Sequence, residues 1–440
     1  MTKPIPDAPQ RVPLLGNLVP LLRDPLAYLT SLRDHGDLVR VRIGPLAAVV
    51  VCTPALTDQV LRNDRVFDRG GPFFDRLGEL LGDSLVVCPH QRHRRQRRLV
   101  QPAFHPARLP AYAGVMTARI AERVGSWQDG QVLDVVDEMV SLTAGITVAT
   151  MFGDALSPSS LRQALDDLAV VFAGVTRRIL VPPPLDRLPT PGSRRDQRAA
   201  ARLRATLGEV VAERRAGTTD HGDLLSALLS AGGPDDGGLT DTELVDQLLA
   251  FFGAGTETAA TTLSWALHLL DRHPEIGDRV HAEARTVLAG SPAALGHLPH
   301  LELTSRVVTE TLRLRPPGWV FTRTAAVDTD LAGHPIPAGT TVVYSPYLLH
   351  HRPDQYADPE LFDPDRWDLR RPAPAREAFV PFGGGARKCI GDRFALTEIT
   401  LALATIVARW SLRTPPGQRV RPALGAALTP KGLLMRVSSW

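Results

Sequence analysis

The stretch Phe382-Gly-Gly-Gly-Ala-Arg-Lys-Cys389-Ile-Gly391 carries the most specific pattern in the chain. Its consecutive glycines permit turns with positive φ and a close approach of the backbone to a flat ligand. Cys389 precedes an expected helix, whose N-terminal dipole and free N–H groups favour a thiolate, and Arg387 adds a cation nearby. A lone cysteine after such a turn is more often a buried packing residue. The whole ten-residue pattern F-x-x-G-x-R-x-C-x-G is what favours a ligand.

A second distinctive stretch, Ala254-Gly-Thr-Glu-Thr258, lies in the longest expected helix. Thr240 and Glu243 have capping-box spacing at its start, and His273-Pro274 ends it, giving a length of ~45 Å. The Thr258 hydroxyl can bond the Ala254 carbonyl and bend the helix. Gly255 is expected to leave room there for a diatomic ligand, and Glu257 offers a carboxyl for proton delivery. A dinucleotide loop is disfavoured because these glycines follow no strand.

Together the two stretches resemble the cytochrome P450 family, in which the cysteine loop ligates haem iron and the acid–alcohol pair delivers protons. The resemblance implies a mainly α fold with minor β structure. It implies one haem-thiolate domain over residues 1–440, with haem b between the long helix and the cysteine loop. Cys389 would be the iron ligand and O₂ the co-substrate, because a thiolate ligand favours O–O cleavage. Glu257 and Thr258 would be catalytic, and Phe382, Gly391 and Ala254 would border the haem.

The basic run over residues 92–98 has no interleaved aromatic residues, which disfavours nucleic-acid binding. His93 and Arg97 are four residues apart and share a helix face. By resemblance they hold a haem propionate, although the first position is often Trp in the family. Arg323 and Arg387 resemble the other propionate partners. The remaining arginines and Lys388 would form a basic face suited to an acidic ferredoxin.

Glu310 and Arg313 stand at i,i+3 and can pair on one helix face. The arginine fork would leave donors for carbonyls in the Pro- and Asp-rich segment over residues 351–371. By resemblance, Arg366 joins them in a buried network that serves folding and haem retention.

Within the family, several stretches resemble bacterial terpene-oxidising members. The predicted function is oxidation of a cyclic sesquiterpene or diterpene in secondary metabolism, with electrons from a ferredoxin and its reductase. The alternatives are a fatty acid or polyketide substrate, a peroxide-driven variant, and a non-catalytic haem sensor. An almost entirely apolar chamber suits a hydrocarbon, and its expected walls are Phe73, Phe74, Leu248, Phe251, Ala254, Trp319, Val320 and Leu428.

The bulk composition is that of a globular protein, with 440 residues, 44% hydrophobic and 22% charged, and a net charge of only +3. The three cysteines form no C-x-x-C pair and make a poor disulfide framework. No signal peptide is apparent, and no stretch approaches the ~18 consecutive apolar residues of a membrane span. The chain is expected to be cytoplasmic, without a membrane anchor. His90-x-x-His93 and His350-His351 lack zinc-site partners.

The remaining elements follow from periodicity and breakers. Expected features are a hairpin from Val39–Ile43 and Val49–Val51, helices Pro274–Leu288 and Leu301–Arg313, strands near Ile336 and Thr341–Tyr344, a helix after Gly391, a C-terminal hairpin near Leu424–Val437, and loops at Pro182–Pro184, Leu188–Gly192 and Gly232–Gly238.

Overall fold

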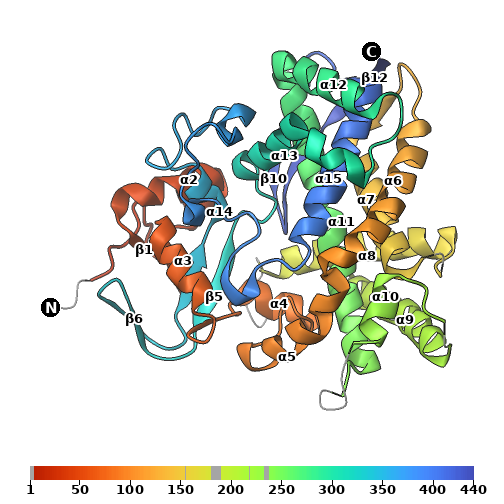
Figure 1. Ribbon diagram of the computed structural model, residues 1–440. Helices are drawn as coiled ribbons and strands as arrows, with labels where there is room; N and C mark the ends of the chain where they lie inside the picture. The colour runs from red at the N-terminus through yellow and green to blue at the C-terminus, as the bar shows by residue number, and fades with distance from the viewer. Residues whose placement is uncertain (1–3, 154, 180–189, 218, 232–236) are drawn as a thin grey trace. The chain divides into compact units, whose positions relative to one another are not determined.

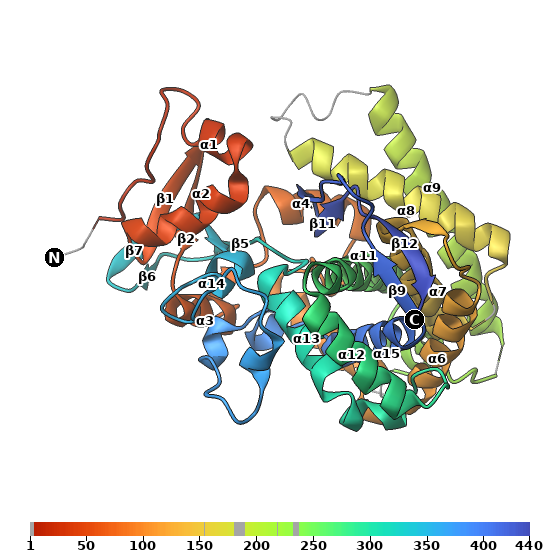
Figure 2. The same cartoon turned by 90° about the horizontal axis from the view of Figure 1, so that it is seen from above.

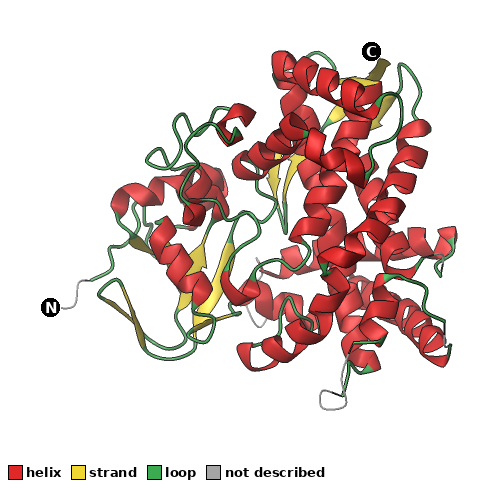
Figure 3. Ribbon diagram, viewed as in Figure 1, coloured by secondary structure: helices red, strands yellow, loops and turns green. Residues whose placement is uncertain are grey.

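The computed structural model describes residues 4–153, 155–179, 190–217, 219–231 and 237–440. The chain divides into two compact units. The sheet unit comprises Met1–Asp75, Pro89–Gln91 and Leu312–Cys389, and the helical unit comprises Arg76–Cys88, Arg92–Thr311 and Ile390–Trp440. Figure 3 shows that strands and loops dominate the first unit and helices the second.

The sheet unit contains a five-stranded sheet in the order β1-β2-β8-β5-β3. The expected hairpin is confirmed as antiparallel β1 and β2, joined at Gly44-Pro45, and β2 pairs in parallel with β8. Neighbouring strand residues point to opposite faces, so Val39 and Val50 enter one apolar cluster and Val49 another. Both faces of the sheet are therefore buried. Its strands are β1 (Leu38–Ile43), β2 (Leu46–Val51), β3 (Phe67–Asp68), β5 (Phe321–Ala325) and β8 (Thr341–Tyr344).

The helical unit is built around α11 (Asp241–Arg272), which Figure 2 shows nearly end-on with other helices around it. The predicted capping box is present: the Thr240 hydroxyl accepts from the Glu243 N–H at 3.2 Å, and the Glu243 carboxylate accepts from the Thr240 N–H at 2.9 Å. The helix ends at His273, where Pro274 begins the next one. A predominantly apolar sequence buries most of α11, so it forms the core of this unit.

The other elements have the following bounds (Figure 1). The helices are α1 (Leu18–Arg23), α2 (Pro25–Ser31), α3 (Pro54–Arg62), α4 (Pro72–Leu81), α5 (His90–Val100), α6 (Leu109–Gly125), α7 (Val135–Phe152), α8 (Pro158–Ile179), α9 (Pro191–Ala216), α10 (Leu224–Leu229), α12 (Pro274–Leu288), α13 (Glu302–Leu314), α14 (Pro346–His350) and α15 (Asp392–Arg409). The strands are β4 (Val132–Asp134), β6 (Thr329–Leu331), β7 (His334–Ile336), β9 (Trp410–Arg413), β10 (Arg421–Leu424), β11 (Leu428–Lys431) and β12 (Leu434–Ser439). The 3₁₀ turns are η1 (Leu32–His35), η2 (Gln101–Phe104), η3 (Pro106–Arg108), η5 (Leu295–His300), η6 (Pro364–Trp367), η7 (Arg376–Ala378) and η8 (Gly385–Arg387).

Two local expectations are corrected. The C-terminal hairpin is only β10 with β11, whereas β12 pairs with β9 and β4 in a separate sheet. Pro191 and Gly192 begin α9 instead of ending a loop, because proline suits the first helical turn and Thr190 caps it. The predicted loop at Pro182–Pro184 and parts of those at Leu188–Gly192 and Gly232–Gly238 lie outside the described residues.

One described helix, α7, is long and apolar enough by length and composition to cross a membrane. Its 18-residue window is 72% buried inside the structure. A core helix of a globular protein has the same composition, so this helix is weak evidence for a membrane span.

Candidate functional site

The Cys389 loop belongs to the sheet unit and is closed by its own backbone. The N–H of Cys389 donates to the carbonyl of Phe382 at 2.9 Å. Gly385 has a φ of +64°, and a Cβ there would collide with the backbone carbonyl of Leu61, so glycine is required on both counts. The Cys389 side chain is exposed, whereas Cys52 and Cys88 are buried. Cys389 is therefore the accessible thiol.

A buried cation lies on strand β5 of the same unit. Arg323 is only 1% exposed, and among the described residues its Nε and Nη1 have no hydrogen-bond partner. A guanidinium buried in this way is costly unless an anion compensates its charge. Arg323 therefore fits the carboxylate of a bound group such as a haem propionate.

Arg387 has a different environment from the one expected. Its Nη2 lies 2.7 Å from an oxygen of Asp68, and its Nε lies 3.7 Å from Asp64. Asp64 also contacts the Nδ1 of His90 at 2.9 Å. The sequence contains no local signal for these protein carboxylates, which makes Arg387 a weaker propionate partner than Arg323.

Arg313 makes the contacts with backbone carbonyls that its guanidinium group was expected to make. Its Nη1 donates to the carbonyls of His350 and Pro359 at 2.8 and 2.7 Å, and its Nη2 donates to that of Leu361 at 3.1 Å. These carbonyls lie just before or within the predicted Pro- and Asp-rich segment. Glu310 and Arg313 are both fully buried on α13.

Arg366 shares an aromatic neighbour with Arg313. The guanidinium carbons lie 5.9 and 5.1 Å, respectively, from the ring centroid of Tyr356. The structure thus brings these two arginines together around one buried ring.

In the helical unit, the middle turns of α11 carry a short exposed stripe. Ala254 and Thr258 are exposed, whereas Phe251, Thr256 and Ala259 are buried. The Thr258 hydroxyl donates to the Ala254 carbonyl at 2.7 Å, as predicted. The stripe marks the part of α11 open to a ligand.

Glu257 is half-buried and its carboxyl accepts a hydrogen bond from the backbone N–H of Ala427. Burial raises the pKa of this carboxyl, and the Ala427 N–H offsets part of that rise. A carboxyl with a raised pKa is better suited to hold and release a proton near neutral pH than an ordinary glutamate.

The role predicted for Gly255 is corrected. A Cβ at this position would lie 3.1 Å from the Oγ1 and 3.4 Å from the Cγ2 of Thr147 on α7. The missing side chain thus faces a neighbouring helix and permits close helix packing, rather than leaving room for a diatomic ligand.

The basic run on α5 is partly neutralised by carboxylates of the same unit. Arg92 pairs with Asp83 at 2.5 Å, and Arg95 pairs with Glu243 at 2.6 Å. His93 is buried and Arg97 is half-buried, and their i,i+4 spacing places them on one helix face.

The residues predicted to line the substrate pocket differ in how exposed they are. In the sheet unit, the rings of Phe73 and Phe74 pack edge to face at 5.2 Å, and Trp319 and Val320 are half-buried. In the helical unit, Phe251 packs on Phe104, and Leu248 and Leu428 have no exposed surface at all. Contrary to expectation, the last two do not border open space.

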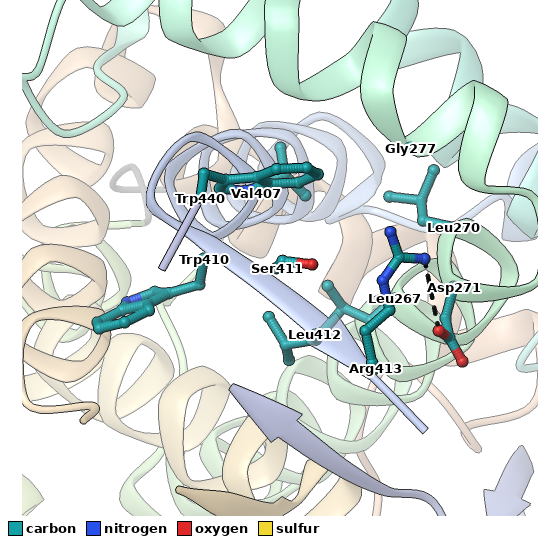
Figure 4. Close-up of a pocket in the computed structure, with 10 residues that line it drawn as sticks. All are labelled: Leu267, Leu270, Asp271, Gly277, Val407, Trp410, Ser411, Leu412, Arg413 and Trp440. Atoms are coloured by element: carbon teal, nitrogen blue, oxygen red, sulfur yellow. Dashed lines mark ion pairs between the residues drawn. The ribbon is translucent and has the colours of Figure 1, made fainter. Parts of the chain in front are cut away.

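A small pocket near the C-terminus is too small to be the substrate site (Figure 4). It has a volume of about 30 Å³, whereas ligand pockets occupy hundreds of Å³. Leu267, Leu270 and Asp271 line it from the last turns of α11, and Arg413 lies 3.7 Å from Asp271. None of the predicted site residues lines it.

Comparisons with known proteins agree with these features. The family model described as Cytochrome P450 matches residues 6–437. The chain is 47% identical over 413 residues to cyclooctat-9-en-7-ol 5-monooxygenase of Streptomyces melanosporofaciens, covering 93% of this chain and 90% of the relative. It is 44% identical over 434 residues to pentalenene oxygenase of Streptomyces avermitilis, covering 98% and 97%. The crystal structure of a cytochrome P450DA heme domain superposes with a TM-score of 0.90 at 27% identity, covering 100% of this chain and 98% of that one. The chain belongs to the cytochrome P450 family of haem-thiolate monooxygenases.

Proposed function

We propose that this monooxygenase hydroxylates or further oxidises a cyclic terpene hydrocarbon, a sesquiterpene or diterpene of secondary metabolism. The observation that carries the proposal is the similarity, over at least nine-tenths of both chains, to a cyclooctat-9-en-7-ol 5-monooxygenase and a pentalenene oxygenase. The aromatic side chains of Phe73, Phe74, Phe251 and Trp319 supply apolar surface suited to a hydrocarbon.

We propose Cys389 as the iron ligand of haem b. When bound, the haem supplies a thiolate-ligated iron at which O₂ is activated. The exposed thiol of Cys389 and its glycine-rich loop support this assignment. Arg323, Arg97, His93 and, more weakly, Arg387 would hold the propionates. The proposed assignment treats residues 1–440 as one haem-thiolate monooxygenase domain.

Thr258 and Glu257 are the proposed proton donors. The overall reaction places one atom of O₂ in the substrate and reduces the other to water, and it consumes two electrons and two protons. The Thr258 hydroxyl, now bonded to the Ala254 carbonyl, can rotate to donate its proton and recover one from Glu257. The raised pKa of Glu257 favours a carboxyl that holds this proton until it is needed.

The electrons require a redox partner, for which we propose a ferredoxin and its reductase. The sequence contains no flavin or nicotinamide fingerprint of its own. Lys388, exposed beside Cys389, gives an acidic ferredoxin a cation to contact. Such soluble electron carriers would place the reaction in the cytoplasm.

An optical titration of the ferric holoenzyme with cyclic sesquiterpene and diterpene hydrocarbons tests the substrate class. We expect a saturable low-to-high-spin shift with one member of the panel, and product formation when NADPH, ferredoxin and reductase are added. A set of fatty acids is titrated in parallel. A shift with a fatty acid and with no terpene would discard the terpene assignment and keep the monooxygenase.

Replacing Thr258 tests the proton role. Thr258→Ala should lower product formed per NADPH by about tenfold and raise hydrogen peroxide release, since general-acid assistance is commonly worth this factor or more. Ser264→Ala is the matched control, because its hydroxyl makes the same kind of bond in the same helix, to the Ala260 carbonyl, beyond the turn that carries Thr258. Unchanged coupling in Thr258→Ala would remove this residue from the mechanism.

A further inference from the structure

Helix α7 buries mainly apolar side chains, but one side of it also places a row of threonines in the core. Thr143, Thr147 and Thr150 recur at spacings of four and three, which places them on one side of the helix. Their side chains are buried, at 0%, 5% and 2% exposure. Each buried hydroxyl costs free energy unless it is hydrogen-bonded. A core helix would therefore be more stable with apolar residues here, unless a hydroxyl has a specific task.

Thr143 has such a task, because it contacts the backbone of α11. Its Oγ1 lies 2.9 Å from the carbonyl oxygen of Thr256 and 2.9 Å from that of Met139 in its own helix. A hydroxyl has one proton, so these two carbonyls share it, with the Val140 carbonyl farther away at 3.4 Å. A donor added to the Thr256 carbonyl competes with the helical hydrogen bond and tilts that carbonyl toward α7.

The turn that Thr143 contacts is the one that carries the proposed proton donors. Hydroxyl groups also donate to its neighbouring carbonyls: Thr258 bonds the Ala254 carbonyl at 2.7 Å, and Thr262 bonds that of Thr258 at 2.9 Å. Both of these donors belong to α11 itself. Carbonyls that accept an extra hydroxyl bend a helix, so the shape of this turn depends on three hydroxyls, one of which comes from α7.

Thr147 sets the distance between the two helices. Gly255 approaches it so closely that a Cβ would lie 3.1 Å from Oγ1. Within the described part of the chain, this hydroxyl has no hydrogen-bond partner, so Thr147 acts here through its size. The close approach allows the Thr143 hydroxyl to reach Thr256.

We propose that Thr143 is a positioning residue for the monooxygenase reaction. Its hydroxyl holds the Thr256 carbonyl and thereby fixes the orientations of Glu257 and Thr258, which follow directly in the chain. Thr143 acts only through the backbone of α11. This inference rests on the proton role proposed above for Glu257 and Thr258.

The test compares Thr143→Val, which removes the hydroxyl at nearly constant volume, with Thr143→Ser, which retains it. In the valine variant we expect product per NADPH to fall about fivefold, the factor that one hydrogen bond is typically worth. Peroxide release should rise by the corresponding amount. The serine variant should recover coupling to within about twofold, although it lacks the methyl group, because the hydroxyl and not the packing carries the effect.

A readout independent of turnover follows the carbonyl itself. Protein labelled with ¹³C-carbonyl threonine and ¹⁵N glutamate gives one HNCO cross-peak for Thr256–Glu257 and a few for the other Thr–Glu pairs. In the reduced carbonyl complex, which is diamagnetic, Thr143→Val should shift this cross-peak and Thr143→Ser should restore it. A variant with normal coupling and an unmoved cross-peak overturns the proposal.

Thr150→Val is the matched control, since it is the same substitution on the same buried face three residues beyond Thr147. It should leave coupling and the cross-peak unchanged, and equal uncoupling in this variant would show a general packing effect and overturn the proposal. Thr258→Ala distinguishes failure of the positioning role of Thr143 from failure of the proton role of Thr258 and Glu257. If Thr258→Ala uncouples and Thr143→Val does not, only the positioning role is lost. If Thr258→Ala couples normally, the proton role proposed above fails, and the positioning role that rests on it fails as well.

Discussion

Exposure distinguishes the three cysteines at the scale of single residues. Burial raises the pKa of the Cys52 thiol to about 12, which keeps it protonated at neutral pH. Cys88 is also buried, whereas Cys389 is exposed at the end of its loop. A metal ligand must be a deprotonated and accessible thiol, and only Cys389 of the three meets the second condition.

Cys389→Ser should therefore abolish the thiolate-type absorption of the reduced carbonyl complex and lower monooxygenase activity by more than about 100-fold. An alkoxide is a poor replacement because serine is not ionised near neutral pH. Cys52→Ala, which alters a buried cysteine of the same unit, should keep the spectrum. Survival of the thiolate spectrum in Cys389→Ser would show that the ligand has been misassigned.

At the scale of elements, the start of α11 combines a local signal with a tertiary one. Thr240 and Glu243 form the capping box, and Arg95 on α5 binds the same Glu243 carboxylate at 2.6 Å. Burial alone would raise the pKa of Glu243, but the Thr240 N–H and Arg95 outweigh it and lower that pKa. The box therefore anchors α5 as well as beginning α11.

Thr240→Ala should reduce the free energy of unfolding by about 1 kcal/mol, the usual worth of an N-cap side chain. Thr242→Ala, at an exposed position two residues into the same helix, is expected to change it by less than about 0.5 kcal/mol. Urea unfolding followed by circular dichroism measures both. Equal effects in the two variants would mean that the cap does not contribute to stability.

At the scale of the whole molecule, stability should depend on pH through a buried histidine. The His350 Nε2 accepts from the Val380 N–H at 3.0 Å, so its Nδ1 must carry the proton that bonds the Arg313 carbonyl at 3.1 Å. Burial, and then the charge of Arg313, lower the pKa of His350 from 6.5 to about 3. Burial also places the pKa of neighbouring His351 well below its ordinary value.

A histidine with a lowered folded pKa contributes stability above the unfolded pKa, near 6.5, and loses it as pH falls toward 3. The loss should approach ~1.4 kcal/mol per pH unit for such a group. His350→Gln offers an amide oxygen to Val380 and cannot be protonated, so its stability should fall less between pH 7 and pH 5. His300→Gln, at an exposed site, should match the parent chain. An unchanged pH dependence in His350→Gln would rule out His350 as its source.

Local sequence signals predicted much of the architecture. Caps and helix-breaking residues predicted the bounds of α11 and α12 and the hairpin β1–β2. The i→i−4 geometry of a helix predicted the hydrogen bond from Thr258 to Ala254. All of these signals act within a few residues. The Arg313 contacts with backbone carbonyls were also predicted, because the motif and the segment rich in Pro and Asp both stand in the sequence.

Contacts between distant segments could not be predicted in this way. Three such contacts join residues that share no local sequence pattern. They are the pairing of β12 with β9 and β4, the contact of Arg387 with Asp68, and the ion pairs of Arg92 and Arg95. The Cys389 loop and the Ala254–Thr258 turn show most clearly the difference between local signals and tertiary contacts. The sequence by itself singled out Cys389, the ligand proposed here, and determined the hydroxyl-bearing turn of α11, because both depend on residue type and short spacing. Only the tertiary structure decided that Gly255 faces Thr147 and that Thr143 holds the Thr256 carbonyl, because helix packing depends on the surface of both helices at once.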